Sequence, residues 1–469
     1  MRIIVIGGGI AGLSAAHRLV ELGSEKKLSL DVVLLEARER VGGVIATKNK
    51  DGFLIEEGPD SFITTKPWAF DLCRRLGLES QLINTDDKNR RTFVVRSGEL
   101  IPIPDGLFMI APTQFKPFLT SPLFSWHGKL RMLMDLVIPA KTHKDDESLA
   151  SFVIRRLGRE ALERLAQPMI GGIYTADPEK LSMRATMPRF LEMEVEHGSI
   201  IRAMLHEQQK AKKLKRADSG ARYSLFMSLR DGMETLVNSI TSHLPEGVIK
   251  LAKQVKDLEF KDGNWHVTTD QGEGFSADAV IIAAASNLAS KLVKGFDRSL
   301  SEDLSGIQFA SSVVINMAYR RKDILHPLNG FGFVVPAVEG RSIIACSFSS
   351  VKFPGRAPEG FALLRCFLGG AIQPEIYERD DALLTEIVHE ELSRLLQIKG
   401  DPVFESLRRY PNSMPQYHVG HLELVSRIFN RVDKYPGLAL AGGAYYGVGL
   451  PDCVHSGEMA AEKLIKQIG

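Results

Sequence analysis

The 469-residue sequence predicts a protein that combines an α/β fold with an α+β fold. An apolar strand at residues 3–6 runs into a glycine-rich turn and an alanine-rich helix, which is typical of a βα unit in a parallel sheet. A second apolar strand, at residues 279–284, is expected to rejoin that sheet. Residues 91–185 show mainly helical spacing, whereas residues 296–402 contain alternating segments typical of antiparallel strands.

These observations predict a discontinuous domain organisation. We expect a Rossmann-like cofactor-binding domain, an antiparallel-sheet substrate domain and a helical subdomain. The cofactor-binding domain is predicted from residues 1–47, 222–295 and 403–469. The substrate domain is predicted from residues 48–90, 186–221 and 296–402, and the helical subdomain from residues 91–185. The length supports such a division, because a single core rarely grows beyond about 250–300 residues.

The glycine-rich turn predicts a dinucleotide site. Gly7 permits the sharp turn, Gly9 lets a pyrophosphate approach the backbone, and Gly12 lets the helix lie close to the strand. The free N–H groups and positive end of the helix would then face the phosphates. Glu36 ends the second strand, where a carboxylate binds a ribose diol and repels a 2′-phosphate. This favours FAD or NAD over NADP.

Composition excludes several functional classes. A net charge of +2 and the lack of a long Lys/Arg block give no support to a nucleic-acid partner. No run of about 18 apolar residues predicts a membrane span. Four dispersed cysteines argue against a zinc site or a disulfide scaffold and favour a reducing compartment, so we expect a cytoplasmic protein. Residues 100–139 are apolar enough for a channel wall or for a surface that touches a membrane, and the wall is the favoured alternative.

A run at residues 36–43 bears on which cofactor the Rossmann-like domain binds, and predicts an FAD-binding domain by resemblance. It resembles the flavoprotein superfamily of amine oxidases, carotenoid desaturases and porphyrinogen oxidases through Glu36, Ala37, Arg40, Gly42 and Gly43. The resemblance implies FAD, with a C-terminal strand and helix supplying a second helix N-terminus near the flavin. The residues expected to bind FAD are Gly7, Gly8, Gly9, Ile10, Ala11, Gly12, Glu36, Ala37, Arg40, Gly42, Gly43, Val44, Gly58, Pro59, Asp60, Ser61, Val255, Tyr410, Gly443, Val448, Gly449 and Leu450.

Further stretches narrow the family. Residues 413–421 read Ser-Met-Pro-Gln-Tyr-His-Val-Gly-His, and with residues 172–174, 330–336 and 447–452 they resemble the bacterial protoporphyrinogen and coproporphyrinogen oxidases of haem biosynthesis. The resemblance spans nearly the whole chain. It implies removal of six electrons from a porphyrinogen, with O₂ as acceptor and H₂O₂ as product. Transient contact with other haem-pathway enzymes is a further expectation.

The pair His418 and His421 has the i, i+3 spacing of a metal site. Gly420 and the lack of nearby carboxylate or thiol partners favour a hydrogen-bonding role in a loop instead. We therefore expect no metal.

A porphyrinogen needs an apolar slot and a few cations at its rim. By resemblance, Ile173, Phe331, Val334 and Phe367 form the slot, although each could equally be core, and Lys66 is the candidate cation. No catalytic acid or base is nominated, because the pyrrole proton leaves readily after hydride transfer. Coproporphyrinogen III carries more propionates than protoporphyrinogen IX, and it is the favoured substrate because several cations are expected near the slot to meet these acidic arms. The cations expected near the slot are Lys66, Arg90, Arg91, Arg96, Arg184 and Arg189.

Two other functions remain open. A flavin amine oxidase would place paired aromatic rings before the flavin, and Tyr445 and Tyr446 lie in a suitable region. A non-catalytic flavoprotein has no sequence feature in its favour.

Overall fold

A computed structural model describes residues 1–108, 110–141, 145–215 and 225–468. The chain divides into two units. Unit 1 comprises residues 1–84, 223–308 and 422–469, and unit 2 comprises residues 85–222 and 309–421, apart from the undescribed residues in these ranges. Residues 48–84, which the sequence analysis assigned to the substrate domain, fall in unit 1. The division into three domains stays a prediction, and residues 216–221 of its segment 186–221 lie outside the described residues.

Unit 1 is built on a five-stranded parallel sheet in the order β12-β2-β1-β16-β22. The strands are β1 (Arg2–Ile6), β2 (Asp31–Leu35), β12 (Ile249–Lys250), β16 (Ala279–Ile282) and β22 (Leu438–Leu440). They come from three distant parts of the sequence, and β16 pairs with β1 in parallel. The expectation that residues 279–284 rejoin the N-terminal sheet is therefore confirmed. The inner strands are continuously apolar because both faces are buried.

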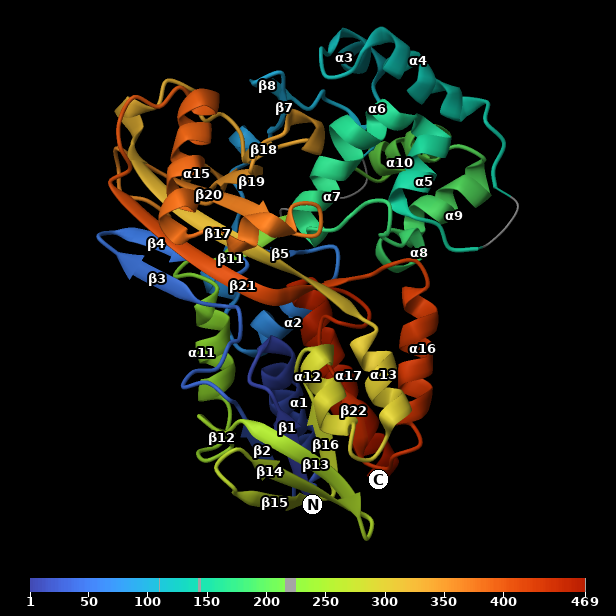
Figure 1. The fold of residues 1–469 in the computed structure, drawn as a ribbon, viewed down its shortest axis with the longest axis vertical. Coiled ribbons are helices and arrows are strands. Elements are labelled where there is room, and N and C mark those ends of the chain that lie inside the picture. Colours follow the sequence, from blue (N-terminus) through green and yellow to red (C-terminus); the bar gives the residue numbers. More distant parts are fainter. Residues whose placement is uncertain (109, 142–144, 216–224, 469) are drawn as a thin grey trace. The chain divides into compact units, whose positions relative to one another are not determined.

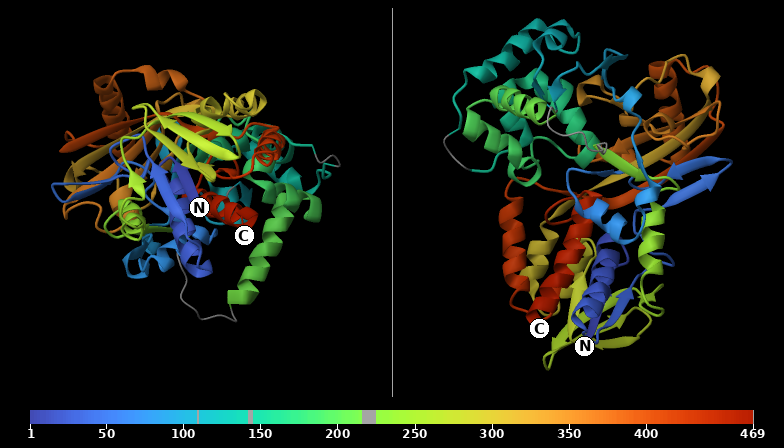
Figure 2. Two further views of the ribbon diagram at one scale, coloured as in Figure 1. Left: turned by 90° about the horizontal axis from the view of Figure 1, so that it is seen from below. Right: turned by 180° about the vertical axis from the view of Figure 1, so that it is seen from behind.

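Helices α1 (Ile10–Lys26) and α17 (Leu450–Ile468) lie side by side against this sheet (Figures 1 and 2). Each follows a parallel strand, so both helices begin at the carboxyl edge of the sheet. Gly457 permits their close approach, because a Cβ there would overlap the carbonyl oxygen of Ala11. The remaining helices of unit 1 are α2 (Trp68–Arg75), α11 (Glu234–Ser242), α12 (Ser286–Val293), α13 (Arg298–Ser305) and α16 (His421–Val432), whose first residue belongs to unit 2.

Small antiparallel sheets complete unit 1. A hairpin joins β3 (Thr47–Lys50) to β4 (Phe53–Glu56) through Asp51 and Gly52, both at positive φ. Residues 43–46, which precede β3, form a turn and loop that pack on the glycine-rich turn. The other strands are β5 (Phe62–Ile63), β6 (Leu82–Asn84), β11 (Phe226–Leu229), β13 (Val255–Lys261), β14 (Asn264–Thr269) and β15 (Gly274–Ala277).

Unit 2 contains a seven-stranded sheet in the order β21-β17-β20-β19-β18-β7-β8. The strands are β7 (Thr92–Arg96), β8 (Glu99–Pro102), β17 (Gln308–Arg320), β18 (Gly332–Val334), β19 (Ile343–Phe348), β20 (Phe361–Gly369) and β21 (Phe404–Gln416). β17 pairs with β20, β20 with β19, β19 with β18 and β7 with β8 in antiparallel fashion, whereas β7 and β18 are parallel. The predicted antiparallel sheet is thus confirmed. Helix α15 (Asp381–Leu396) buries its apolar side in the core of this sheet.

The helical part of unit 2 runs from α3 to α10. Its helices are α3 (Phe115–Thr120), α4 (Trp126–Leu133), α5 (Leu149–Leu157), α6 (Arg159–Ala161), α7 (Gln167–Tyr174), α8 (Met183–Thr186), α9 (Pro188–His197) and α10 (Ile200–Lys215). A fully buried ion pair between Arg156 and Asp135, 2.5 Å apart, lies in this part. Within the residues that the structure describes, no helix is long and apolar enough to cross a membrane.

Candidate functional site

The glycine-rich turn of unit 1 is sterically required. Gly7 has φ +109°, and a Cβ there would lie 2.8 Å from the carbonyl oxygen of Ala283. A Cβ on Gly12 would overlap the carbonyl oxygen of Gly7. The strand, turn and helix can therefore approach one another only with glycine at these positions.

Gly9 faces open space instead. A Cβ built on Gly9 would meet no atom within 4 Å. Gly9 is the N-cap of α1, with no side-chain cap and no acidic residue in the first turn. The first N–H groups of α1 thus present positive potential to an uncovered space, which is the arrangement that binds a pyrophosphate.

Glu36 holds the glycine turn in place. Its Oε2 accepts a 2.6 Å hydrogen bond from the Gly8 N–H, and its Oε1 accepts a 2.9 Å bond from the Arg38 N–H. Glu36 as a whole residue is 8% exposed. Each oxygen retains acceptor capacity for a ribose hydroxyl. The sequence predicts only a ribose contact for Glu36, and the structure adds this positioning role.

The segment after Glu36 wraps over the turn. The Gly42 N–H donates to the Gly8 carbonyl at 2.7 Å, and Gly43 packs against Gly9. The guanidinium of Arg40 donates to the carbonyls of Val41, Gly43 and Ile45 at 2.8–3.1 Å. The Arg40 side chain therefore holds the turn by donating to three of its backbone carbonyls. Val44, in the same turn, is 47% exposed.

Two more predicted segments reach the same site in unit 1. Gly58 packs so closely on the Val44 carbonyl that a Cβ would overlap it, and the Asp60 carbonyl accepts a 2.7 Å bond from the Ser228 hydroxyl. Near Glu36, the Lys253 N–H donates to the Glu36 carbonyl at 2.8 Å, which brings Val255 to this end of the site. The structure thus brings together the predicted residues of the glycine turn, of residues 40–44 that cover it, and of these two segments.

Helix α17 extends the site away from the glycine turn. Gly457 packs on Ala11, so Leu450 lies seven residues, or about 10 Å, beyond the level of the α1 N-terminus. Val448, Gly449 and Gly443 precede or flank this N-terminus, and Gly443 contacts Cys453. Burial raises the pKa of the Cys453 thiol to about 12, and the charge of Asp452 adds to the shift. The two staggered helix ends suit an elongated ligand that carries negative charge beside each of them.

Lys66 meets a carboxylate of its own unit. Its Nζ lies 2.6 Å from Asp452 Oδ1, and the Lys66 side chain is 44% exposed. Two residues further on, Trp68 stacks on His455, with ring centroids 4.0 Å apart. Burial lowers the pKa of His455, although Asp452 and Glu462 oppose that shift. A substrate propionate would have to compete with Asp452 for Lys66.

The predicted slot residues lie in unit 2. Val334 on β18 pairs with Ala345 on β19, and Ala345 pairs with Phe367 on β20. Directly paired residues project from the same face of a sheet. Gly172 of α7 packs on Ala345, which brings the neighbouring Ile173, 52% exposed, to this face. Phe331 precedes β18, where its carbonyl accepts from the Phe348 N–H.

Arg365 was not anticipated from the sequence. It lies two residues from Phe367 on β20, so both project from the same face, and its guanidinium is 4.9 Å from the Phe367 ring centre. Arg365 is 4% exposed. A charged residue inside the otherwise apolar segment 362–368 was the available signal. Of the other predicted cations, Arg189 pairs with Glu207 at 2.6 Å.

The histidine run lies at the end of β21. The His421 ring stacks on that of Tyr417, with centroids 4.0 Å apart, and the backbone N–H of His421 donates to the His418 carbonyl. Burial lowers the pKa of His418, and the positive charge of Lys180 lowers it further. Asp146 accepts hydrogen bonds from the Ser182 hydroxyl and the Gly420 N–H. Tyr410 also lies on β21 in unit 2, so its predicted contact with the flavin stays a prediction.

Comparison with known proteins identifies the class of this arrangement. The family described as flavin containing amine oxidoreductase matches residues 10–465. Coproporphyrinogen III oxidase of Bacillus subtilis is 35% identical over 98% of this chain and 96% of its own length. Protoporphyrinogen oxidase 1 of Arabidopsis thaliana chloroplasts is 31% identical over 96% of this chain and 85% of its own length. A structure from Exiguobacterium sp. 255-15, named as a candidate protoporphyrinogen oxidase, is 31% identical with a TM-score of 0.86 and covers 99% of this chain and 98% of its own.

Proposed function

Because the chain belongs to the family of flavin-containing amine oxidoreductases, we propose that it oxidises coproporphyrinogen III to coproporphyrin III with FAD as cofactor. The reaction removes six electrons, takes O₂ as acceptor and yields H₂O₂. Similarity to coproporphyrinogen III oxidases along nearly the whole chain is the observation that carries this proposal. Protoporphyrinogen IX is the second candidate substrate, supported by the names of the plant relatives.

The residues of unit 1 fit FAD. The uncovered N-terminus of α1 at Gly9 suits the pyrophosphate, and Glu36 has acceptor capacity for the ribose. The α17 N-terminus at Leu450 would stabilise negative charge at the far end of the cofactor. Bound FAD would supply the hydride acceptor for a meso carbon and the route for the electrons to O₂.

On the substrate side, we propose that residues of unit 2 orient the macrocycle. Ile173, Val334 and Phe367 would supply its apolar contacts, and Arg365 would supply a buried positive charge for an acidic arm. No side chain is needed as a base, because the pyrrole N–H is acidified once the hydride has left. Orientation is then the main contribution of this unit to catalysis.

We also propose a cytoplasmic location and transient contact with neighbouring enzymes of the haem pathway. Both rest on the sequence analysis, through the four dispersed cysteines and the family resemblance.

Turnover of coproporphyrinogen III, protoporphyrinogen IX and a primary amine under air tests the proposal. Porphyrin fluorescence and peroxide are followed together. We expect turnover of both porphyrinogens, a larger kcat/KM for coproporphyrinogen III and none for the amine. A tenfold larger kcat/KM for protoporphyrinogen IX, or about 1.4 kcal/mol in the opposite sense, would reverse the substrate assignment. Turnover of the amine alone would replace the proposed function by that of an amine oxidase.

A further inference from the structure

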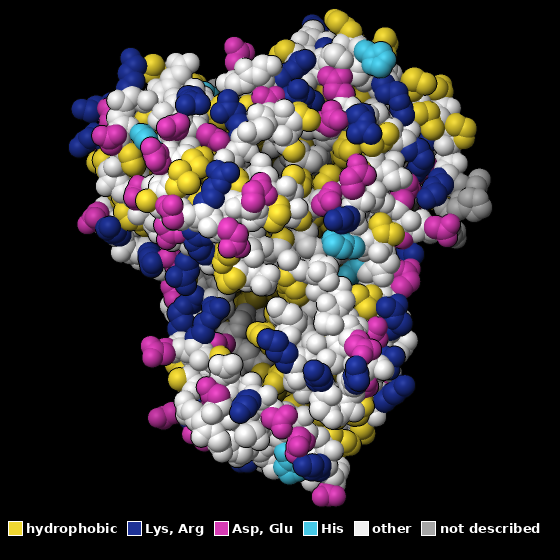
Figure 3. Space-filling view, viewed as in Figure 1, with side chains coloured by type: hydrophobic (Ala, Val, Ile, Leu, Met, Phe, Trp, Pro, Cys, Tyr) yellow, Lys and Arg dark blue, Asp and Glu magenta, His cyan; other side chains and the backbone are white. Residues whose placement is uncertain are grey.

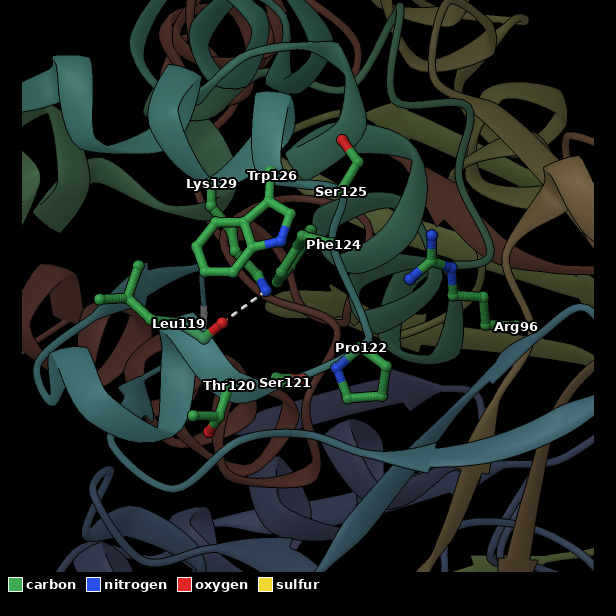
Figure 4. Close-up of a pocket in the computed structure, with 9 residues that line it drawn as sticks. All are labelled: Arg96, Leu119, Thr120, Ser121, Pro122, Phe124, Ser125, Trp126 and Lys129. Carbon is green, nitrogen blue, oxygen red and sulfur yellow. Dashed lines mark hydrogen bonds between the residues drawn. The ribbon is translucent and has the colours of Figure 1, made fainter.

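An open pocket of about 460 Å³ lies in unit 2 between β7 and the helices α3 and α4. Figure 4 shows that its walls come from the end of α3, the following turn and the start of α4. The nine lining residues include two cations and no carboxylate. They are Arg96, Leu119, Thr120, Ser121, Pro122, Phe124, Ser125, Trp126 and Lys129.

The two cations are held without an anion between them. Lys129 is 4% exposed, donates to the Leu119 carbonyl at 2.7 Å and lies 4.5 Å from the Trp126 ring centre. The guanidinium of Arg96 has no hydrogen bond or ion pair within the described part of the chain. Burial lowers the pKa of Lys129, and the positive charge of Arg96 lowers it further. The negative charge of Glu160 acts in the opposite direction and raises this pKa.

Glu160, whose charge acts on Lys129, is already engaged. Glu160 accepts bonds of 2.7 and 2.6 Å from the backbone N–H and the hydroxyl of Ser125, at the N-terminus of α4. Glu160 is not among the residues that line the pocket. A bound anion would relieve the repulsion between the two cations.

The walls determine what else the ligand carries. Leu119, Pro122, Phe124 and Trp126 contribute apolar surface, and the Trp126 side chain is exposed. An apolar body can therefore be covered while its acidic group reaches the cations. Exposed hydrophobic side chains are also visible over the region of α3 and α4 in Figure 3.

We infer that this pocket binds a carboxylate carried on an apolar, planar body. The pocket lies beside the face of the sheet that carries Phe367. Val94 pairs with Val334, which is linked through Ala345 to Phe367, and Arg96 follows Val94 by two residues. Three strand spacings across the sheet and two residues along β7 put the Arg96 backbone about 16 Å from that of Phe367. The ligand is either a tetrapyrrole held by one propionate arm or a separate small aromatic acid.

Calorimetric titration of the FAD-loaded enzyme with 1-naphthoate tests the inference, and the uncharged 1-naphthamide is the matched ligand. We expect saturable binding of the acid and about tenfold weaker binding of the amide. Arg96→Gln should weaken acid binding about tenfold without lowering the unfolding temperature, because its side chain bonds to no described residue. Lys116→Gln, which removes an exposed cation of α3 outside the pocket, is the control and should change nothing.

A second titration distinguishes the two sources of the ligand. Displacement of naphthoate by coproporphyrin III at the Arg96-dependent site identifies the tetrapyrrole, and lack of displacement identifies a separate acid. Equal affinity for acid and amide would overturn the inference. The same holds if Arg96→Gln binds like the wild type, or if Lys116→Gln weakens binding as much as Arg96→Gln. None of these results bears on turnover of the porphyrinogen.

Discussion

The FAD region of unit 1 and the slot face of unit 2 are built in different ways. In unit 1 the predicted contacts come mainly from the backbone, through the open Gly9 and the free N–H groups of α1. In unit 2 they come from side chains, such as Ile173 on α7 and Phe367 on β20, which are nearly 200 residues apart. A backbone site demands glycine at fixed local spacing, whereas a side-chain site demands only suitable residues on one face. Changes in the first region should therefore act on FAD, and changes in the second on the substrate.

The largest effect is expected at Gly12. Replacement with valine would drive the side chain into the Gly7 carbonyl, so the turn and helix would have to separate. We expect purified protein with little or no FAD, measured as the ratio of flavin to protein absorbance. The control is Gly295→Ala, because a Cβ there meets no atom within 4 Å. Full FAD content in Gly12→Val would mean that the cofactor does not lie on this turn.

A smaller loss of FAD is expected at Glu36. Glu36→Ala removes the acceptor for the Gly8 and Arg38 N–H groups and the expected ribose contact. FAD affinity should fall about 10- to 100-fold, or about 1–3 kcal/mol, by titration of the apoprotein. Glu25→Gln, an exposed carboxylate on α1, should leave the affinity unchanged. Affinity at the wild-type level in Glu36→Ala would remove Glu36 from the site.

In unit 2, a change at Ile173 should affect the substrate alone. Ile173→Asn alters a half-exposed side chain, so its cost in folding should be small. We expect kcat/KM for coproporphyrinogen III to fall about 5- to 30-fold, from loss of about 1–2 kcal/mol of apolar contact, with FAD content unchanged. Val195→Asn on α9, which is 67% exposed, is the matched control. An equal fall in both variants would assign Ile173 to general surface packing.

The smallest effect is expected at the ion pair of Lys66 and Asp452. Because Lys66 is 44% exposed, their interaction should contribute about 0.2–1 kcal/mol. A double-mutant cycle with Lys66→Met and Asp452→Asn should show non-additive effects on kcat/KM. Charge reversal at Lys66 should still lower coproporphyrinogen activity more than protoporphyrinogen activity. Additive effects would mean that Lys66 acts independently of Asp452.

The same contrast explains what could be predicted from the sequence. The parallel sheet and the glycine turn were predictable because strand, turn and helix are adjacent, and steric demand fixes the glycines. The strand at 279–284 was recognisable because both its faces are buried. The pairing of Lys66 with Asp452 joins residues nearly 400 positions apart, and no local pattern encodes it. Arg365 and the Arg96 pocket likewise depend on which strands and helices become neighbours.

The proposal that a bound flavin oxidises coproporphyrinogen III can be tested by rapid mixing of the oxidised enzyme with this substrate in the absence of O₂. We expect the yellow flavin absorbance to bleach at a rate that depends on the coproporphyrinogen III concentration. Readmission of O₂ should restore the colour and give three molecules of H₂O₂ for each coproporphyrin III formed, because each peroxide carries two of the six electrons. Flavin that stays oxidised in the presence of excess coproporphyrinogen III would contradict the account.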